Sequence, residues 1–295
     1  MPFNKILFHT RFREQAFNSL RAVLALKAAG LQEVVLTHVV PRDEVAFVPF
    51  GGYLREEGER LLADARKQFE AWQAAISAEG VTSTIRVEVG IMNAKILEIA
   101  AEEKVDLIVA GPKKRGLAQH IYVGMHILDL LRRSPLPVLW SKHVVEFEAE
   151  GQTRTRVNDR FWERPMLATD WSQPSAKARA AVASLKGAAR SAIVAHVIDE
   201  KLTKGRDAHA LQELEAETRR RLESCCRELK DAGIEAEPRL AFGKSVPEVI
   251  RLSREHQATM IVLGKTGKDW FQQYFMGGVS HRIAEASELP VMVVP

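Results

Sequence analysis

Cysteine is scarce in this chain of 295 residues: the only two are adjacent, Cys225 and Cys226. Neighbouring positions of a helix point about 100° apart, so the pair is badly placed to form a disulfide or to share a metal ion. Nine histidines occur, but without a His-x-x-x-His or Cys-x-x-Cys spacing, and we therefore predict no metal site. Buried or half-buried thiols in a reducing compartment explain the cysteines.

Long apolar runs and an excess of one charge are also lacking. No stretch approaches the roughly 20 apolar residues that a membrane-spanning helix needs, and residues 1–9 enter a strand pattern without the layout of a signal peptide. The net charge is only +4, from 42 basic and 38 acidic side chains. Nucleic-acid binders concentrate their basic residues, whereas the densest basic run, residues 219–221, lies among glutamates. We expect a cytoplasmic protein without nucleic-acid or membrane partners.

Two catalytic signatures are missing as well. There is no Gly-x-Ser-x-Gly nucleophile elbow, so a hydrolase triad has no anchor. Gly264-Lys265-Thr266 resembles the end of a phosphate-binding P-loop, but Thr259 stands where such a loop needs its first glycine.

The chain does contain an internal repeat, two copies of one sequence module. Residues 90–138 fall on residues 243–291 after a shift of 153 positions, without a gap. The shift superposes Gly111 on Gly264, Gly124 on Gly277, Pro137 on Pro290 and Ile108 on Ile261. Repetition over about 150 residues indicates duplicated domains, because the repeats of solenoids are several times shorter.

Each half alternates short apolar runs with long amphipathic stretches, which is the pattern of βαβ units around a parallel sheet. Nearly continuous apolar runs such as residues 260–263 are typical of strands covered on both faces. We predict an N-terminal domain at residues 1–145, a polar linker at 146–163 and a C-terminal domain at 164–295. The predicted strands are residues 5–9, 33–39, 83–89, 106–111 and 137–141 in the first half, and 165–169, 191–198, 235–241, 259–264 and 290–294 in the second.

Three segments of the second half are expected to converge where parallel strands end, which is where open α/β sheets bind ligands. They are Thr169-Asp170 after the first strand, His196-Val197 at the end of the second, and the glycine loop after the fourth. Asp170 offers an acceptor for the hydroxyls or amino group of a nucleoside.

The glycine loop suits a phosphate. Gly264 and Gly267 can take positive φ and let a ligand approach the backbone. Gly277 and Gly278 have no side chains to cover the backbone amides at the start of a helix, and the positive end of a helix attracts anions. Ser280 adds a hydroxyl group.

These residues resemble the universal stress protein family. Its nucleotide-binding members carry Gly-x-x-Gly, nine residues, then Gly-Ser/Thr after the fourth strand, and an Asp after the first. The resemblance covers nearly the whole chain as a tandem pair. It implies two flavodoxin-like (adenine nucleotide alpha hydrolase-like) α/β domains, each with a five-stranded parallel sheet between helices, whose last strands pair as a pseudo-dimer within one chain. The implied ATP site consists of Thr169, Asp170, Val197, Gly264, Gly267, Gly277, Gly278, Val279 and Ser280.

Both halves depart from the family motif, the first far more. Gly278 stands where the motif has Ser or Thr, which we expect to weaken phosphate binding by about 0.5–1.5 kcal/mol, one hydrogen bond. In the first half, Thr10 is aligned with the motif's Asp and Lys114 with its second glycine. Met125 and Ile127 occupy the two serine positions. That half is not expected to bind ATP in the family manner.

The resemblance implies a cytoplasmic stress-response protein that binds ATP or another adenine nucleotide, with or without Mg²⁺, in its C-terminal domain. It would act through conformation or protein partners, with at most slow ATP hydrolysis, because no general base is positioned by the sequence. The alternative is a scaffold or partner-binding protein whose nucleotide sites are vestigial, or whose N-terminal domain holds a different small ligand. Further homodimerisation stays open.

Overall fold

A computed structural model of the chain describes residues 2–12, 15–47, 52–53, 55–111, 125–142, 144–149, 152–265 and 278–295. The first half contains strands β1 (Lys5–His9), β2 (Glu33–Pro41), β3 (Ala46–Phe47), β4 (Gly52–Tyr53), β5 (Thr82–Gly90), β6 (Leu107–Ala110) and β7 (Val138–Trp140). Its helices are α1 (Ala16–Leu24), the 3₁₀ helix η1 (Ala25–Ala29), α2 (Arg42–Val45), α3 (Arg55–Ala78), α4 (Met92–Glu102) and α5 (Met125–Arg133).

The second half repeats this order. Its strands are β10 (Pro165–Ala168), β11 (Ser191–Asp199), β12 (Glu235–Gly243), β13 (Met260–Gly264) and β14 (Val291–Val294). Its helices are α6 (Gln173–Ala183), α7 (Glu200–Thr203), α8 (Ala208–Asp231), α9 (Ser245–Glu255) and α10 (Val279–Ala286). All ten strands predicted from the sequence are present, so the α/β prediction is confirmed. We refer to β1–β7 with their helices as the first module and to β10–β14 with theirs as the second module.

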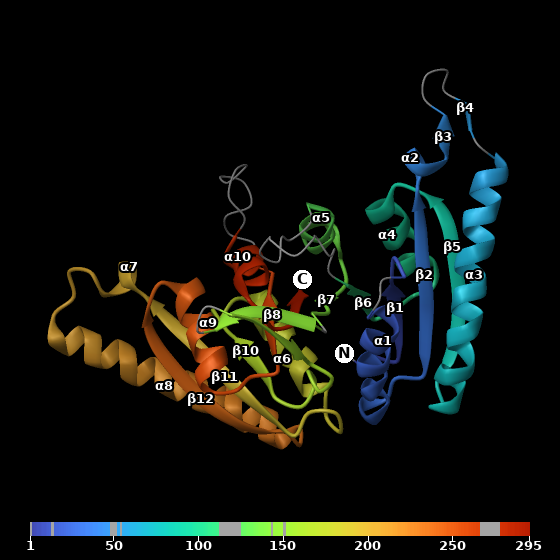
Figure 1. The fold of residues 1–295 in the computed structure, drawn as a ribbon. Helices are drawn as coiled ribbons and strands as arrows, with labels where there is room; N and C mark the ends of the chain where they lie inside the picture. Colours follow the sequence, from blue (N-terminus) through green and yellow to red (C-terminus); the bar gives the residue numbers. More distant parts are fainter. Residues whose placement is uncertain are drawn as a thin grey trace.

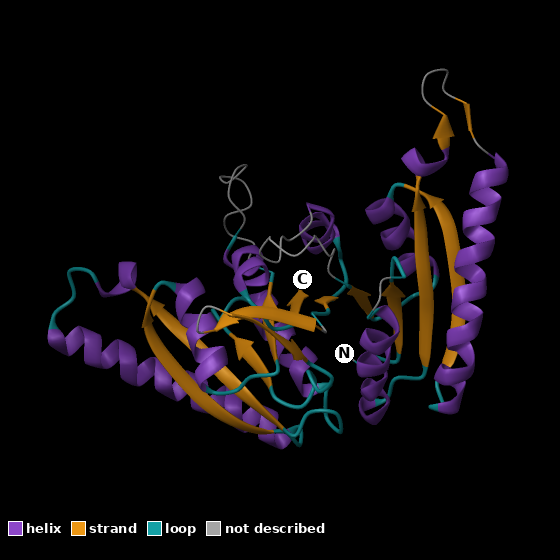
Figure 2. Ribbon diagram, in the orientation of Figure 1, coloured by secondary structure: helices purple, strands orange, loops and turns teal. Residues whose placement is uncertain are grey.

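The two five-stranded sheets join into one sheet in the order β12-β11-β10-β13-β14-β7-β6-β1-β2-β5 (Figures 1 and 2). Within this ten-stranded sheet the neighbouring strands of each module are parallel, whereas β14 and β7 run antiparallel, with Met292 opposite Leu139. Strands β3 and β4 form a separate antiparallel pair. The long connections of βαβ units explain the parallel pairs. The antiparallel pairing of β14 with β7 removes the open edge that each module alone would expose. The pseudo-dimer expected within one chain is therefore present.

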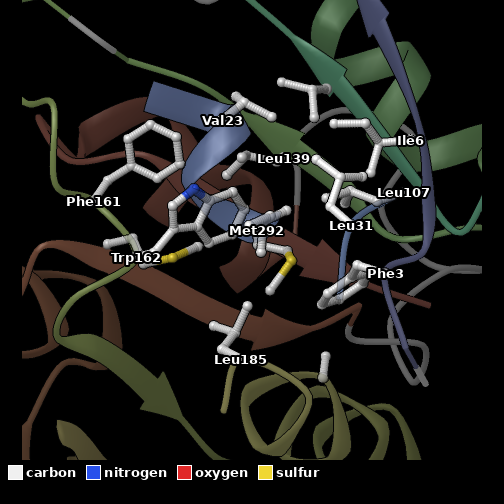
Figure 3. Packing of buried hydrophobic residues seen from close by; sticks show 14 of the residues in the cluster. Phe3, Ile6, Val23, Leu31, Leu107, Leu139, Phe161, Trp162, Leu185 and Met292 are labelled. Carbon is white, nitrogen blue, oxygen red and sulfur yellow. The ribbon is translucent and has the colours of Figure 1, made fainter. Parts of the chain in front are cut away.

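Helices cover both faces of the sheet, because side chains of a strand point alternately to its two faces. On one face, α1, α3, α6 and α8 bury a cluster that continues from one module to the other. Leu139, Met292 and Trp162 lie together in this cluster at the module junction (Figure 3). On the opposite face, α4, α5, α9 and α10 enclose the second cluster.

The predicted linker is more structured than its polar composition indicates. Strands β8 (Val144–Ala149) and β9 (Gln152–Val157) form an antiparallel hairpin there. Phe161 and Trp162, at its end, are fully buried. The Trp162 indole Nε1 donates a hydrogen bond of 3.0 Å to the Ala22 carbonyl of α1, which ties this segment to the first module.

A reciprocal pair of lysines also joins the modules. Lys142, just after β7, is fully buried and donates to the carbonyls of Ala284 (2.9 Å) and Ser287 at the end of α10. Lys265, just after β13, donates to the Arg132 carbonyl (2.5 Å) at the end of α5. Each module thus satisfies carbonyls at the end of the other module's last helix, where a positive charge is favourable.

Two smaller predictions have outcomes here. Cys225 and Cys226 are both buried on α8 as free thiols. Within the part of the chain that the structure describes, no helix combines the length and apolarity needed to cross a bilayer.

Candidate functional site

Thr169 lies at the end of β10 and shapes the turn that follows. Its amide continues the sheet by donating to the Ala195 carbonyl (2.9 Å). Its buried hydroxyl lies 2.7 Å from the Ser175 hydroxyl and accepts a hydrogen bond from the Trp171 amide (3.2 Å). Trp171 has a φ of 65°, a conformation rare for a bulky residue. The Thr169 side chain therefore supports a tight, strained turn at the carboxyl edge of the sheet.

Asp170 is the exposed residue of this turn. Its Oδ1 accepts hydrogen bonds from the amide (3.0 Å) and hydroxyl (2.5 Å) of Ser172, an arrangement that directs the chain into a helix. Ser172 is in turn the N-cap of α6 and accepts from the Ser175 amide. Within the described residues Oδ2 of Asp170 has no hydrogen-bond partner, so this oxygen can accept from a ligand.

The next strand along contributes His196 and Val197. His196 Nδ1 lies 2.7 Å from the Thr169 carbonyl, and because a carbonyl only accepts, Nδ1 carries the proton. The imidazole packs against the Trp171 ring, with centroids 5.0 Å apart and planes 31° apart. Burial lowers the pKa of His196, against the effects of the Thr169 carbonyl and of Asp170. Val197 is half-buried and packs on the opposite face of the sheet with Ala168.

Gly264 behaves differently from its sequence-based expectation. It ends β13, and its φ is outside the left-handed region. A Cβ at this position would lie 2.5 Å from both the Pro174 carbonyl carbon and the Ser175 amide nitrogen. The missing side chain therefore admits the chain's own helix α6 close to the sheet. The expectation of a positive φ at Gly264 is wrong, because the tight contact is with α6 and needs only the absence of Cβ.

The remaining predicted residues belong to the glycine loop and α10. Gly278 is the N-cap of α10, and its carbonyl accepts from the amides of His281 (3.0 Å) and Arg282 (3.2 Å). Val279 is exposed, while Ser280 is buried in the first turn. Gly267 and Gly277 lie outside the described residues. The structure thus brings Thr169, Asp170 and His196 together at one edge and closes Gly264 against α6.

Sequence reasoning missed Trp171, Ser172 and Ser175, which build the turn around Asp170. The signal for Ser172 was available: a serine followed by proline at the first turn of a helix is a common N-terminal pattern. No local sequence pattern predicts the role of Ser175, because its hydroxyl contacts Thr169 at the end of β10 and its amide lies against Gly264 at the end of β13.

The first module repeats this turn and corrects the alignment of its residues. Ile6 pairs with Leu107 as Pro165 pairs with Met260. The shift between β1 and β10 is therefore 159 positions, and Thr10 matches Thr169. Arg11, not Thr10, matches Asp170.

The hydrogen bonds agree with this corrected alignment. The Phe12 amide donates to the Thr10 hydroxyl (3.0 Å), and His38 Nδ1 lies 2.8 Å from the Thr10 carbonyl. Phe12, with a φ of 52°, packs 5.0 Å from the His38 ring, as Trp171 does on His196. Aligning Thr10 with the motif's Asp was wrong because the gapless repeat does not extend back to the first strands.

Comparisons with known proteins agree with this architecture. The sequence profile of the universal stress protein family matches residues 2–142 and 162–295. Universal stress protein MJ0577 of Methanocaldococcus jannaschii is 26% identical over 151 residues, which are 46% of this chain and 93% of that protein.

Solved structures resemble the whole tandem. A universal stress protein from Archaeoglobus fulgidus superposes with a TM-score of 0.73 at 18% identity, covering 100% of this chain and 99% of that one. A protein of unknown function from Pseudomonas aeruginosa PAO1 has a TM-score of 0.62 at 14% identity, covering 99% and 92%. At such identities these two show the fold alone. The two profile matches span most of the sequence, and this chain belongs to the universal stress protein family.

Proposed function

We propose that the second module binds an adenine nucleotide, ATP being the ligand that the family resemblance implies, at the carboxyl edge of its sheet. The bound nucleotide would change the conformation of the protein or its contacts with partners, in a cytoplasmic stress response. The proposal takes residues 1–145 and 164–295 as the two domains. It keeps the nine residues of the implied site, with Gly264 acting through packing.

The observation that carries the proposal is the difference between the two copies of one turn. Both copies keep the threonine, the aromatic residue and the histidine with matching hydrogen bonds. Only the second presents a carboxylate, Asp170, with one oxygen used by Ser172 and the other available. A carboxylate accepts from ribose hydroxyls or an adenine amino group, as a nucleoside requires. Ser280 and the amides that begin α10 supply donors of the kind that phosphates need.

Any Mg²⁺ would be held mainly through the nucleotide. Among the described residues no three His, Cys, Asp or Glu side chains gather into a metal site. An ion brought in with the nucleotide would neutralise part of the phosphate charge there. Binding measured with and without Mg²⁺ tests this part separately.

Calorimetric titration with ATP tests the proposal. The Asp170→Asn variant keeps an oxygen acceptor for Ser172 but removes the charge, and Asp170→Ala removes both. We expect Asp170→Ala to weaken ATP binding by about tenfold or more, since hydrogen bonds to charged groups contribute about 1.5–3 kcal/mol. Asp231→Asn, at the exposed end of α8, removes an equal charge elsewhere and is expected to bind ATP like the unaltered protein. Equal affinity in Asp170→Ala would exclude Asp170, and no binding by the unaltered protein would refute the function.

The alternative, a scaffold with vestigial nucleotide sites, has two observations in its favour. Gly264, a motif glycine, is closed by α6, and Gly278 lacks the motif's hydroxyl. Mass spectrometry of small molecules released from gently purified protein separates the two functions. An adenine nucleotide in stoichiometric amount supports binding, and its absence together with flat titrations supports the scaffold.

A further inference from the structure

The first module keeps the frame of the Asp170 turn but changes the chemistry on it. The frame consists of Thr10, Phe12 and His38, whose hydrogen bonds and ring contact reproduce those of the second module to within 0.2 Å. Phe12 and Trp171 also share a positive φ, so side chains at matching positions start from corresponding points of the turn. Their differences therefore bear directly on what each edge can bind.

The most exposed position of the turn is inverted in charge. Arg11 stands where the second module has Asp170. The Arg11 side chain is about one quarter exposed (28%), and it forms an ion pair with Glu44 at 3.6 Å, beyond hydrogen-bonding distance. Among the residues that the structure describes, no hydrogen bond from the Arg11 guanidinium competes with a ligand, and Glu44 is its one ion-pair partner. A guanidinium recognises carboxylate and phosphate oxygens in a planar, bidentate manner, and it repels the donors that Asp170 would attract.

The position at the end of the strand is also changed, from an apolar to a polar group. His9 takes the place of Ala168, and by strand alternation it lies on the face of Leu7, under α4 and α5. Ala168 packs there with Val197 and Val246, whereas the first module has Asn93 in place of Val246. The floor of this edge is therefore polar in the first module and apolar in the second.

His9 carries an unused polar atom. It is 6% exposed, and its buried Nε2 has no hydrogen-bond partner within the described part of the chain. An unpaired buried polar group is costly, so this nitrogen calls for an explanation. Burial, with His38 and Arg11 nearby, lowers the pKa of His9 to about 3. The ring is thus neutral at physiological pH, and the tautomer with a proton on Nε2 can donate to an anion.

We propose that the carboxyl edge of the first module binds a small oxyanion, a carboxylate or a phosphate group, through the Arg11 guanidinium with His9 Nε2 as a second donor. The nucleoside-type contact of Asp170 is replaced here by an anion contact. This inference does not depend on ATP binding by the second module, because Arg11 and His9 belong to the other copy.

Titration calorimetry at constant ionic strength tests the inference, with inorganic phosphate and succinate as separate probes and chloride as the background anion. We expect one or both probes to bind. Arg11→Gln should weaken that binding about tenfold or more, the fold-change of losing a charge-assisted hydrogen bond. Arg21→Gln, which removes an exposed arginine of α1, is the matched control and should bind as the unaltered protein does. The stronger probe identifies whether phosphate or carboxylate is preferred.

His9→Ala installs the residue of the second module and should weaken the same binding severalfold. Because that change alters a buried site, ¹⁵N spectra of the unaltered protein give an independent readout: the His9 Nε2 resonance should shift with probe concentration and stop shifting in Arg11→Gln. Binding of neither probe, or equal binding in Arg11→Gln, would overturn the inference. ATP titrations of the same variants keep its failure distinguishable from failure of the proposed function.

Discussion

Replacing Lys142 by methionine should change how the stability of this protein depends on pH. The ammonium of Lys142 is fully buried at the module junction, where it donates to the carbonyls of Ala284 and Ser287 and lies 4.0 Å from the centre of the Trp140 ring. Burial lowers the pKa of Lys142 from its ordinary 10.5 to about 7, although Glu288 acts in the opposite direction. Methionine fills a similar volume and does not titrate.

The sign follows from proton binding. Between about pH 7 and pH 10.5 the unfolded chain holds a proton on Lys142 that the folded protein increasingly lacks. Stability rises with pH wherever the unfolded state binds more protons. The penalty for burying the charge is therefore fully present below pH 7 and fades towards pH 10.5.

The magnitude can be worked from the two pKa values. Each unit corresponds to 1.36 kcal/mol, so the shift from 10.5 to about 7 gives a penalty of about 4–5 kcal/mol at low pH. Of this, about 2 kcal/mol should disappear between pH 7 and pH 9. The carbonyls and the Trp140 ring offset part of the cost. Only the slope with pH isolates the titration, since Lys142→Met also leaves two helix carbonyls unpaired.

The assay is urea unfolding of both proteins at intervals between pH 6 and pH 9. The difference in unfolding free energy, unaltered protein minus Lys142→Met, should increase by about 2 kcal/mol from pH 7 to pH 9 and be flat below pH 6. Lys265→Met is the matched control from the other module, and its half-buried ammonium should give a smaller slope. Parallel curves for the unaltered protein and Lys142→Met would refute the reasoning.

Three further outcomes are expected. Gly264→Ala should destabilise the protein by about 1–3 kcal/mol because its Cβ meets the backbone of α6. Gly111→Ala should change stability by less than about 0.5 kcal/mol, because no described residue apart from its chain neighbours lies within 4 Å of a Cβ there. Urea unfolding compares the two variants, and equal effects would contradict the packing argument. Trp162→Phe should lower the free energy of unfolding by about 1–3 kcal/mol, since it removes the indole donor from the buried Ala22 carbonyl. A thermal midpoint equal to that of the unaltered protein would show that the Trp162–Ala22 hydrogen bond does not contribute to stability. Cys225 and Cys226 are both buried, and burial raises the pKa of the Cys226 thiol to about 11. Because burial blocks access, both thiols should resist a thiol reagent at pH 8 until guanidinium unfolds the chain, and rapid labelling of the folded protein would contradict their burial.

The sheet could be predicted from the sequence because its signals are local and repeated. Runs such as residues 260–263 predict strands buried on both faces, and β13 is buried along its whole length. The repeat, with the family resemblance, also indicated that the last strands pair. The polar composition of the linker did not predict that part of it is buried. Phe161 and Trp162 stand among polar neighbours, so no apolar pattern indicates a core segment there, yet both are fully buried.

The site was predictable in part. Asp170 was placed after the first strand, where the structure has it exposed, and its role in binding a nucleoside stays a prediction. Its counterpart Arg11 was missed, since the spacing between the copies is 159 residues at the first strand and 153 residues from β5 onwards, and only strand pairing fixes the register at the first strand. The contacts of Gly264 with α6 and of Lys142 with α10 join residues from separate elements, and no local pattern encodes them.

The two copies of the turn show which positions hold the fold and which are left to bind. Threonine and histidine bond to backbone groups in both copies, Thr10 and His38 in one, Thr169 and His196 in the other. Replacing either residue would leave a backbone group of the turn without its partner, so these positions resist change. Arg11 and its counterpart Asp170 take no part in these threonine and histidine bonds, although Asp170 also accepts from the Ser172 amide. A duplicated module can therefore reverse the charge it offers a ligand without rebuilding the turn.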